Sequence, residues 1–292
     1  TKSLNFINIK MNNILITGST GFVGKQVLKH LKNKNVKIRV VTRNNQKQFF
    51  SSCENVTEIV TTQNFFLETA KWYEKVCKDI DIVIHIAWYA ERGKYIESDL
   101  NLECLSGTLN FAQAAAKQGV KKFVGVGTCF EYDLTSTVPL KTTSKLNPQH
   151  LYSIAKASAF LILSKYFENK SIDFLWARIF YLFGEGEDER SLFGELRKKL
   201  AAGDIVKLTE GKQIRDFIDV EVAGSIIANA SLGSNVGPFN VCSGIGKSVR
   251  ELAENIASEY DAVNLLKFGA RNENPSDEPH VVGVCSRVLT KK

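Results

Sequence analysis

The sequence is short of the features that mark membrane, secreted and metal-binding proteins. No apolar run among its 292 residues approaches the roughly 20 that a membrane-spanning helix needs. The first ten residues contain no apolar segment of signal-peptide length. The six cysteines form no CxxC pair and lack the spacing of metal ligands. We therefore expect a cytoplasmic protein with reduced thiols, no membrane association and no bound metal.

Methionine is also nearly absent, because Met11 is the only one and directly precedes the first strand-like run. We interpret residues 1–10 as a leader or extension outside the fold.

The net charge of +7 favours anionic partners, but the basic residues are dispersed and accompany no recognisable nucleic-acid motif. Small molecules that carry phosphates satisfy this charge equally well. We therefore expect no nucleic-acid partner.

Short, nearly continuous apolar runs alternate with helical patterns along most of the chain. The predicted strands are Ile14–Thr17, Val36–Thr42, Val56–Val60, Ile80–Ala87, Lys122–Gly127 and Asp173–Ile179. The predicted helices are Gly24–Lys32, Phe66–Cys77, Leu100–Gln118, residues 151–167 and Val220–Leu232. Strands of this kind are covered on both faces, and their alternation with helices predicts a parallel, doubly wound α/β sheet. From Leu182 the pattern becomes irregular and more charged.

A glycine-rich turn, Thr17-Gly18-Ser19-Thr20-Gly21-Phe22-Val23-Gly24, connects the first strand to the first helix. Glycines at these three positions permit a sharp turn, close approach of a pyrophosphate and tight packing of helix on strand. The helix N-terminus then offers free N–H groups to the phosphates. The position of the turn at the first strand–helix junction predicts dinucleotide binding.

No acid occurs between Gly24 and Cys53, where an NAD site usually has a carboxylate for the ribose hydroxyls. Arg43 instead follows the second strand, and an arginine there pairs with the 2′-phosphate of NADP. We therefore favour NADP(H), with NAD(H) as the alternative and a solvated surface role for Arg43 still open.

Tyr152 and Lys156 open the helix that follows the Lys122–Gly127 strand, and a spacing of four places them on one face. A free tyrosine, with a pKa of about 10, is a poor acid–base catalyst at neutral pH. A nearby ammonium favours the phenolate, so we expect Lys156 to lower the pKa of Tyr152. Reduction of a ketone requires hydride from a nicotinamide and a proton for the oxygen, which such a tyrosine supplies. Taken alone, the pair is also compatible with two exposed helix residues.

Further stretches resemble the extended short-chain dehydrogenase/reductases, in the nucleotide-sugar branch that forms the NAD-dependent epimerase/dehydratase family. Together with the glycine turn and Tyr152-x-x-x-Lys156, they occur in the family's order and spacing over about residues 12–285. These stretches are His85-Ile86-Ala87, Gly127-Thr128-Cys129-Phe130-Glu131-Tyr132, Arg178-Ile179-Phe180-Tyr181-Leu182-Phe183-Gly184, the GKQIRDFIDV run of residues 211–220, and Phe239-Asn240-Val241.

The resemblance implies a role for each matching residue. Thr128 takes the place of the Ser/Thr that hydrogen-bonds the reacting oxygen, Tyr152 becomes the acid–base, and Lys156 tunes it and holds the nicotinamide ribose. The residues implied to contact the cofactor are Gly18, Thr20, Gly21, Phe22, Val23, Gly24, Arg43, His85, Ala87, Tyr152, Lys156 and Phe180. Those implied to contact the substrate are Tyr89, Glu131, Tyr181, Arg215 and Arg271. For Arg271 a surface role is equally open, and for Glu131 and Trp88-Tyr89 so is loop packing.

The resulting fold prediction is a Rossmann-type doubly wound parallel sheet with a small C-terminal substrate-binding lobe. We assign residues 11–181 to the dinucleotide-binding domain, to which residues 212–240 are expected to return. Residues 182–211 and 241–292 are assigned to the lobe. Relatives in the family commonly dimerise through two helices per subunit, so we expect a homodimer.

Departures from the family pattern narrow the expected chemistry. Dehydratases of the family place Asp and Glu directly after the catalytic Thr, where this chain has Cys129 and Phe130, so dehydration is disfavoured. Epimerase-reductases related to GDP-fucose synthase have a Cys two residues after the Ser/Thr, whereas Cys129 is one residue after it and points to the other face of a strand. Cys104 and Tyr181 replace two asparagines that are usual in the family.

The function that follows is NADPH-dependent reduction of a keto group, at C4 of a nucleotide-diphosphate deoxysugar, in the biosynthesis of deoxysugars or surface polysaccharide. A 4-epimerase that retains NAD is the alternative enzyme and uses the same residues. A cofactor-binding module that has lost catalysis is the alternative of another class, against which the intact Thr128, Tyr152 and Lys156 argue.

Overall fold

The computed structural model describes residues 11–43, 48–273 and 277–290, and the leader expected over residues 1–10 lies outside this range. Its centre is a parallel seven-stranded sheet. In spatial order the strands are β10 (Gly237–Val241), β6 (Asp173–Ile179), β5 (Lys122–Thr128), β4 (Ile82–His85), β1 (Asn12–Thr17), β2 (Val36–Thr42) and β3 (Val56–Thr61). The order reverses direction between β1 and β4. The predicted doubly wound α/β fold is confirmed.

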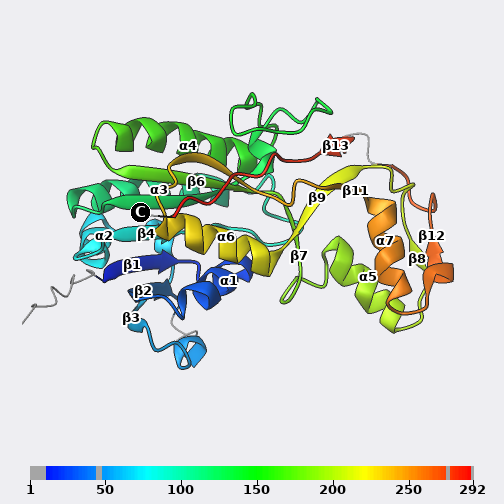
Figure 1. The fold of residues 1–292 in the computed structure, drawn as a ribbon, viewed down its shortest axis with the longest axis horizontal. Helices are drawn as coiled ribbons and strands as arrows, with labels where there is room; N and C mark the ends of the chain where they lie inside the picture. The colour runs from blue at the N-terminus through cyan, green and yellow to red at the C-terminus, as the bar shows by residue number, and fades with distance from the viewer. Residues whose placement is uncertain (1–10, 44–47, 274–276, 291–292) are drawn as a thin grey trace, which may run out of the picture.

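Helices cover both faces of this sheet (Figure 1). One face carries α1 (Phe22–Leu31) and α6 (Val220–Leu232), and the other carries α2 (Ala70–Cys77), α3 (Leu100–Lys117) and α4 (Leu151–Glu168). Strand β1 shows why three apolar residues follow one another at its centre: Ile14 and Ile16 pack in the core beneath α1 and α6, while Leu15 packs in the core on the opposite face. Side chains that point to either face of the strand are therefore buried, as in other parallel sheets.

A smaller lobe follows β6 and lies beside the carboxyl ends of the main strands (Figure 1). It contains a four-stranded sheet, a two-stranded sheet and two helices packed on one another. Its elements are β7 (Tyr181–Phe183), α5 (Leu192–Ala201), β8 (Val206–Lys207), β9 (Ile214–Asp219), β11 (Gly246–Ser248), α7 (Val249–Ser258), β12 (Leu266–Lys267) and β13 (His280–Val281). The lobe has its own apolar core, built around Phe193, Leu196 and Ile256.

The chain passes between the two parts more often than the sequence suggested. Strand β9 pairs with β7, β11 and β13 in the lobe, although residues 212–219 were expected in the main domain. After β13 the chain runs back along the main domain, where Ser286 bonds to Asn240 and Leu289 to Asn235 (Figure 1). These placements depend on strand pairing across the fold, which local patterns do not encode.

Helix α2 is shorter than predicted, because a side-chain cap fixes where it begins. The pattern over Phe66–Cys77 predicted a single helix, but Glu68 is extended and α2 starts at Ala70, where the Thr69 hydroxyl accepts a hydrogen bond from the Trp72 N–H at 3.2 Å. In the described part of the chain, no helix combines the length and apolarity that crossing a bilayer requires.

Candidate active site

A cleft of about 1720 Å³ is lined by both the main domain and the lobe. Its lining begins at the glycine-rich turn after β1 and includes the carboxyl end of β5 and the first turn of α4. It continues to β9 and to the segment before β13. Parallel sheets bind ligands at the carboxyl ends of their strands, where the strand order reverses, and this cleft occupies that position.

The glycine turn is shaped for a ligand that approaches the backbone. Gly18 has a φ of +75°, and a Cβ there would lie 2.6 Å from the Ala87 nitrogen, while a Cβ on Gly24 would overlap the Gly18 carbonyl. Helix α1 begins at this turn with neither a side-chain cap nor an acid in its first turn. Its terminal N–H groups and positive dipole end are thus directed to the cleft, which fits a pyrophosphate.

All but one of the residues expected to contact the cofactor line this cleft. They are Gly18, Thr20, Gly21, Phe22, Val23, Gly24, Arg43, Ala87, Tyr152, Lys156 and Phe180. Arg43 is exposed at the end of β2. At the carboxyl ends of β2 and β3 the cleft is lined by residues 42, 43 and 62–64, none of which carries a carboxylate.

His85 is the exception and corrects the sequence-based expectation. It is absent from the cleft lining and is almost completely buried. Its ring joins two hydroxyls, with Thr17 Oγ1 at 2.7 Å from Nδ1 and Thr108 Oγ1 at 2.9 Å from Nε2. Burial lowers the pKa of His85 to about 3, so the ring is neutral. His85 thus ties β1 to α3 beneath the glycine turn.

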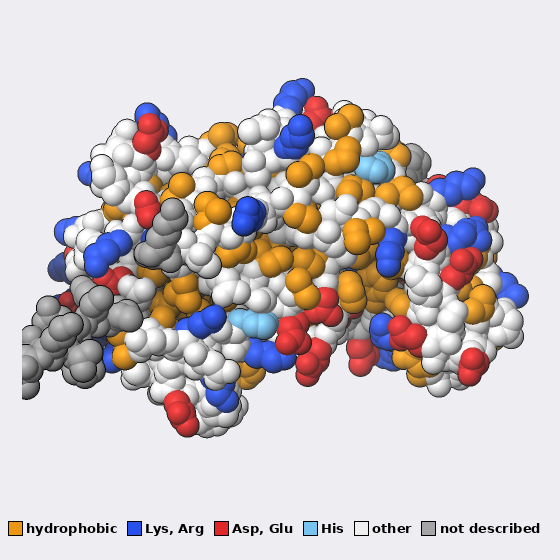
Figure 2. Space-filling model, viewed as in Figure 1, with side chains coloured by type: hydrophobic (Ala, Val, Ile, Leu, Met, Phe, Trp, Pro, Cys, Tyr) orange, Lys and Arg blue, Asp and Glu red, His pale blue; other side chains and the backbone are white. Residues whose placement is uncertain are grey.

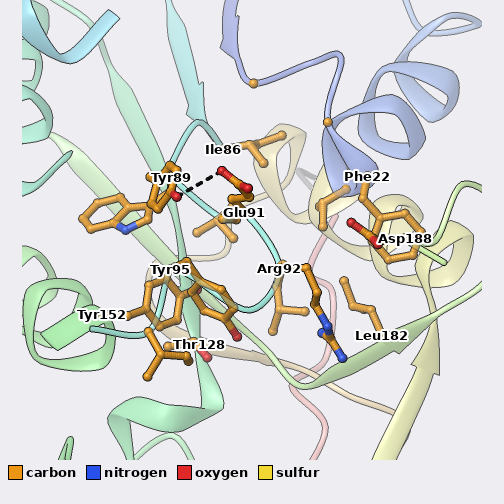
Figure 3. A pocket seen from close by; sticks show the side chains of 18 of the residues that line it. Phe22, Ile86, Tyr89, Glu91, Arg92, Tyr95, Thr128, Tyr152, Leu182 and Asp188 are labelled. Carbon is orange, nitrogen blue, oxygen red and sulfur yellow. Dashed lines mark hydrogen bonds between the residues drawn. The ribbon is translucent and has the colours of Figure 1, made fainter. Parts of the chain in front are cut away.

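Thr128, Tyr152 and Lys156 all line the cleft, and Lys156 Nζ lies 5.9 Å from the centre of the Tyr152 ring. Thr128 ends β5, while Tyr152 and Lys156 lie one turn apart at the start of α4. The Tyr152 ring packs edge-on against Tyr95, with centroids 4.8 Å apart, and Figure 3 shows both tyrosines beside Thr128. Three polar groups with different chemistry thus line the same part of the chain's cleft, where β5 ends and α4 begins.

The pKa shifts of Tyr152 and Lys156 both reflect their burial. Lys156 Nζ donates to the Val126 carbonyl at 2.7 Å and lies 3.9 Å from the centre of the Trp88 ring. Burial lowers the pKa of Lys156 to about 7. Burial, with Tyr95 and Glu131 nearby, raises the pKa of Tyr152 above its ordinary value. Lys156 was expected to lower the pKa of Tyr152, but in this arrangement burial outweighs any such effect, and the buried amine is itself destabilised in its charged form.

Glu131 was expected to contact the substrate, and the structure corrects this as well. Its side chain is 0% exposed and does not line the cleft. The carboxylate is turned inward, where it accepts hydrogen bonds from Trp176 Nε1 at 2.9 Å and Arg178 Nε at 2.7 Å. A buried carboxylate needs such partners, and the sequence around Glu131 gave no sign of them because they lie 45 and 47 residues away.

The other four residues expected to contact the substrate do line the cleft. Tyr89 donates from its hydroxyl to Glu91 at 3.2 Å (Figure 3). Arg215 is buried on β9, with its guanidinium 5.4 Å from the centre of the Tyr181 ring and 3.8 Å from Glu278. Arg271 is exposed and pairs with Glu195 at 3.0 Å. The lobe end of the cleft thus carries two guanidinium groups suited to phosphate oxygens.

Three further lining residues come from one loop; Trp88 was a candidate substrate contact with loop packing as the alternative, whereas Tyr95 and Arg92 were assigned no role from the sequence. Trp88 covers Lys156 and donates from Nε1 to Asn101 at 2.8 Å, and Tyr95 packs on Tyr152. Arg92 lies across the cleft from Tyr152, near Asp188 (Figure 3). All three belong to the loop between β4 and α3, which has no periodic pattern that sequence reasoning can use.

Charge on the rest of the surface is mixed. On the face shown in Figure 2, lysines and arginines are spread among acidic side chains instead of forming one basic patch. Within the residues that the structure describes, no three His, Cys, Asp or Glu side chains are grouped to hold a metal ion.

Comparison with known proteins identifies similar sequences and folds. The model of the family described as NAD dependent epimerase/dehydratase matches residues 14–240. The dTDP-6-deoxy-L-talose 4-dehydrogenase (NAD(+)) of Aggregatibacter actinomycetemcomitans is 27% identical over 85% of this chain and 91% of its own length. UDP-glucuronic acid decarboxylase 1 of Arabidopsis thaliana is 24% identical over 94% of this chain and 63% of its own.

Two solved structures illustrate the likeness of fold. The UDP-N-acetylglucosamine 4-epimerase of Methanobrevibacter ruminantium superposes with a TM-score of 0.79 at 23% identity, covering 95% of this chain and 91% of that one. The Bordetella bronchiseptica enzyme WbmG, solved in complex with NAD, gives a TM-score of 0.78 at 22% identity, covering 96% and 87%. At these identities the likeness establishes the architecture alone.

Proposed function

The chain belongs to the NAD-dependent epimerase/dehydratase family, and from this premise we propose that it reduces a keto group at C4 of a nucleotide-diphosphate deoxysugar with NADPH. The observation that supports this most directly is that Thr128, Tyr152 and Lys156 line the same cleft as the glycine turn and the two arginines of the lobe. The main domain then binds the dinucleotide, and the lobe binds the substrate diphosphate through Arg215 and Arg271.

A bound nicotinamide supplies the hydride in this reaction. Tyr152 donates its phenolic proton to the carbonyl oxygen as that oxygen gains negative charge, while the Thr128 hydroxyl donates a hydrogen bond to the same oxygen. The raised pKa of Tyr152 keeps the phenol protonated, which is the form that reduction needs. When it is charged, the Lys156 amine, 5.9 Å from the centre of the Tyr152 ring, stabilises the phenolate that remains.

The preference for NADPH rests on charge at the adenosine end of the cleft. Arg43 is exposed there, and residues 42, 43 and 62–64 include no carboxylate that would repel a 2′-phosphate. The same fold also accommodates NAD, since WbmG was solved in complex with it. The cofactor of this chain is therefore proposed from its own residues.

A deoxysugar is supported by the apolar side chains beside Thr128. Cys129 and Phe130 follow it directly, and the Phe130 ring packs edge-on against Tyr181 at 5.8 Å between centroids. A methyl group at C6 fits such a surface better than a hydroxymethyl group, whose hydroxyl would be left without a partner. We expect a 6-deoxy-4-keto substrate to be preferred about tenfold or more in kcat/KM over its 6-hydroxyl counterpart.

The active unit is proposed to be a homodimer formed through α3 and α4. Both helices expose large apolar side chains: Leu102 on α3, and Ile154, Leu161 and Ile162 on α4, are 44–58% exposed. Replacing Leu161 and Ile162 by Glu should shift the protein from dimer to monomer in sedimentation equilibrium, and a wild-type monomer would contradict the proposal.

The reductase is separated from an epimerase by the use of cofactor. A reductase consumes one NADPH per product, so the cofactor must exchange on every cycle. We expect purified protein to lose its cofactor on dialysis and to oxidise NADPH stoichiometrically with a 4-keto nucleotide sugar. It should not interconvert UDP-glucose and UDP-galactose without added reductant. Catalytic epimerisation by protein that carries tightly bound NAD would overturn the reductase proposal in favour of a 4-epimerase.

A further inference from the structure

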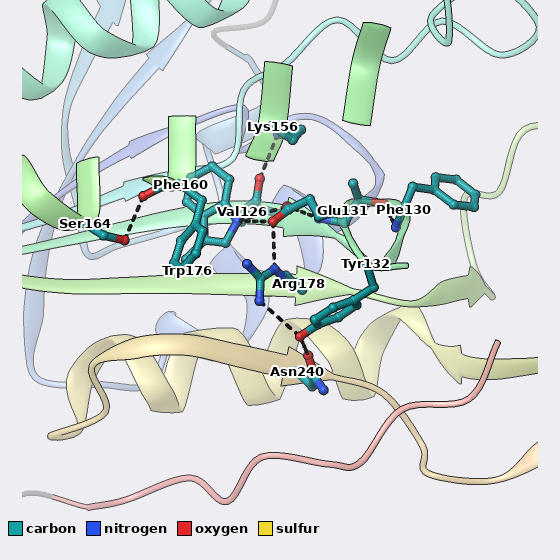
Figure 4. A network of polar contacts seen from close by, with 11 residues as sticks. Val126, Phe130, Glu131, Tyr132, Lys156, Phe160, Ser164, Trp176, Arg178 and Asn240 are labelled. Atoms are coloured by element: carbon teal, nitrogen blue, oxygen red, sulfur yellow. Dashed lines mark hydrogen bonds and ion pairs between the residues drawn. The ribbon is translucent and has the colours of Figure 1, made fainter. Parts of the chain in front are cut away.

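A buried polar network lies directly beneath Thr128 (Figure 4). After β5 ends at Thr128, the chain makes a single 3-10 turn over Cys129–Glu131, which brings the Glu131 carboxylate back to the Thr128 backbone. Glu131 Oε1 accepts from the Thr128 N–H at 2.9 Å, and Thr128 Oγ1 accepts from the Phe130 N–H at 3.3 Å. This reciprocal pair of bonds fixes both the backbone and the side chain of Thr128.

The carboxylate is in turn held from the neighbouring strand. Trp176 Nε1 and Arg178 Nε, both on β6, donate to Glu131 at 2.9 and 2.7 Å. Arg178 is only 1% exposed, and its guanidinium lies between the rings of Phe160 and Tyr132 at 4.4 and 4.7 Å. Three N–H donors thus converge on one carboxylate, and its negative charge compensates a buried cation.

The network reaches the last strand of the sheet. Arg178 donates to the Tyr132 hydroxyl at 3.1 Å, which donates to Asn240 on β10 at 2.6 Å. Asn240 Nδ2 donates to the Leu140 carbonyl at 2.9 Å. The position of Glu131 is therefore determined by strands on two sides and not by its own turn alone.

Strand β5 has the shape that this network needs. A Cβ on Gly127 would overlap both the Trp176 indole nitrogen and Glu131 Oε1, and a Cβ on Gly125 would overlap the Trp176 ring. Both glycines have ordinary extended backbone, so their freedom of conformation is not what requires them. Their lack of a side chain provides the space in which Trp176 and Glu131 meet.

We propose that Glu131 is a positioning residue that orients Thr128, and hence the hydrogen bond that Thr128 offers to the reacting oxygen. The proposal rests on the proposed function for the identity of that oxygen. Glu131 itself does not line the cleft, so it acts only through the Thr128 backbone. A hydroxyl misplaced by about 1 Å is sufficient to lower turnover on the order of a hundredfold.

The test uses Glu131→Gln in the full chain. The amide retains the size of the carboxylate but offers one acceptor oxygen to three donors, so at least one N–H loses its partner. We expect exchange of the Thr128 amide proton, followed by NMR on protein with ¹⁵N-labelled threonine, to accelerate by tenfold or more. With a 4-keto nucleotide sugar we expect kcat to fall about 10- to 100-fold, with NADPH affinity changed less than twofold.

Asp81→Asn provides the matched control. Asp81 is also buried, and it accepts from a backbone N–H (Asn13, 3.1 Å) and pairs with a cation (Lys121, 2.7 Å), but at the opposite end of the sheet. This variant should lose stability without changing Thr128 exchange or kcat. If Glu131→Gln does not fold, Glu131→Asp keeps the charge opposite Arg178 but is one methylene too short to reach all three donors, and should give the same changes.

The two readouts distinguish the possible failures. Unchanged Thr128 exchange in both Glu131 variants would overturn the positioning proposal, whatever the activity. Faster Thr128 exchange with a kcat equal to that of Asp81→Asn would overturn it too, since the network would then be purely structural. Faster exchange in a protein whose wild type turns over no nucleotide sugar supports the contact to Thr128 and defeats the proposed reductase instead.

Discussion

The buried amine of Lys156 makes a prediction about stability that is independent of any substrate. The side chain is 4% exposed, and its pKa falls from 10.5 in the unfolded chain to about 7 in the fold. The unfolded state therefore binds this proton more tightly. As the pH rises from 7 to 10.5, Lys156 in the unfolded chain loses its proton and the free energy of unfolding increases. As the pH falls back to 7, this increase is lost. Between pH 7 and pH 10.5 the free energy of unfolding changes by about 4–5 kcal/mol on account of Lys156.

Lys156→Met removes this penalty, because methionine has a similar length and no charge. The substitution also leaves the Val126 carbonyl without its 2.7 Å donor, which costs about 1–3 kcal/mol. We expect the variant to be more stable than the wild type by about 2 kcal/mol at pH 7. This gain should vanish by roughly pH 9, as the wild-type amine becomes neutral at less cost. Turnover should be lost at every pH, as is common when a destabilised active-site group is replaced.

The measurement is urea unfolding of both proteins, freed of cofactor, at several pH values from 6 to 10. Lys165→Met serves as the control, since Lys165 is on the same helix but its side chain is 69% exposed, so its effect should stay within about 0.5 kcal/mol throughout. A constant difference between Lys156→Met and the wild type across this range would refute the argument. So would a Lys156→Met variant that is less stable at pH 7.

Three further predictions concern the proposed reaction. Tyr152→Phe should lower turnover about 10²–10⁴-fold with NADPH affinity nearly unchanged, because only the proton donor is removed; near-full activity would exclude Tyr152 as the acid. Arg43→Ala should weaken NADPH binding, by isothermal titration, by about 1.5–3 kcal/mol and NADH binding hardly at all. Equal losses for the two cofactors would show that Arg43 does not contact the 2′-phosphate. Gly24→Ala should destabilise the protein by about 1–3 kcal/mol and weaken both cofactors, because the new Cβ overlaps the Gly18 carbonyl; unchanged binding would remove the turn from the cofactor site.

The sequence alone determined the features that depend on neighbours in the chain. Alternating apolar strands and helical patterns predicted the doubly wound sheet, since a strand buried on both faces must be apolar throughout. The glycines at 18, 21 and 24 predicted the turn after β1. The spacing of Tyr152 and Lys156 predicted their common helix face. The start of α2 at Ala70 was not predicted. The apolar pattern continues from Phe66 through Thr69, but the Thr69 side chain caps the helix and fixes its first residue.

Only the tertiary structure decided which side chains face the cleft and which are turned into the core. His85 and Glu131 lie beside cleft residues in the sequence, yet both are buried, because Thr108, Trp176 and Arg178 approach them from distant elements. The pKa of Lys156 likewise depends on burial beneath Trp88. Burial and long-range hydrogen bonding are properties of the packed elements together, so no local pattern of residues can specify them.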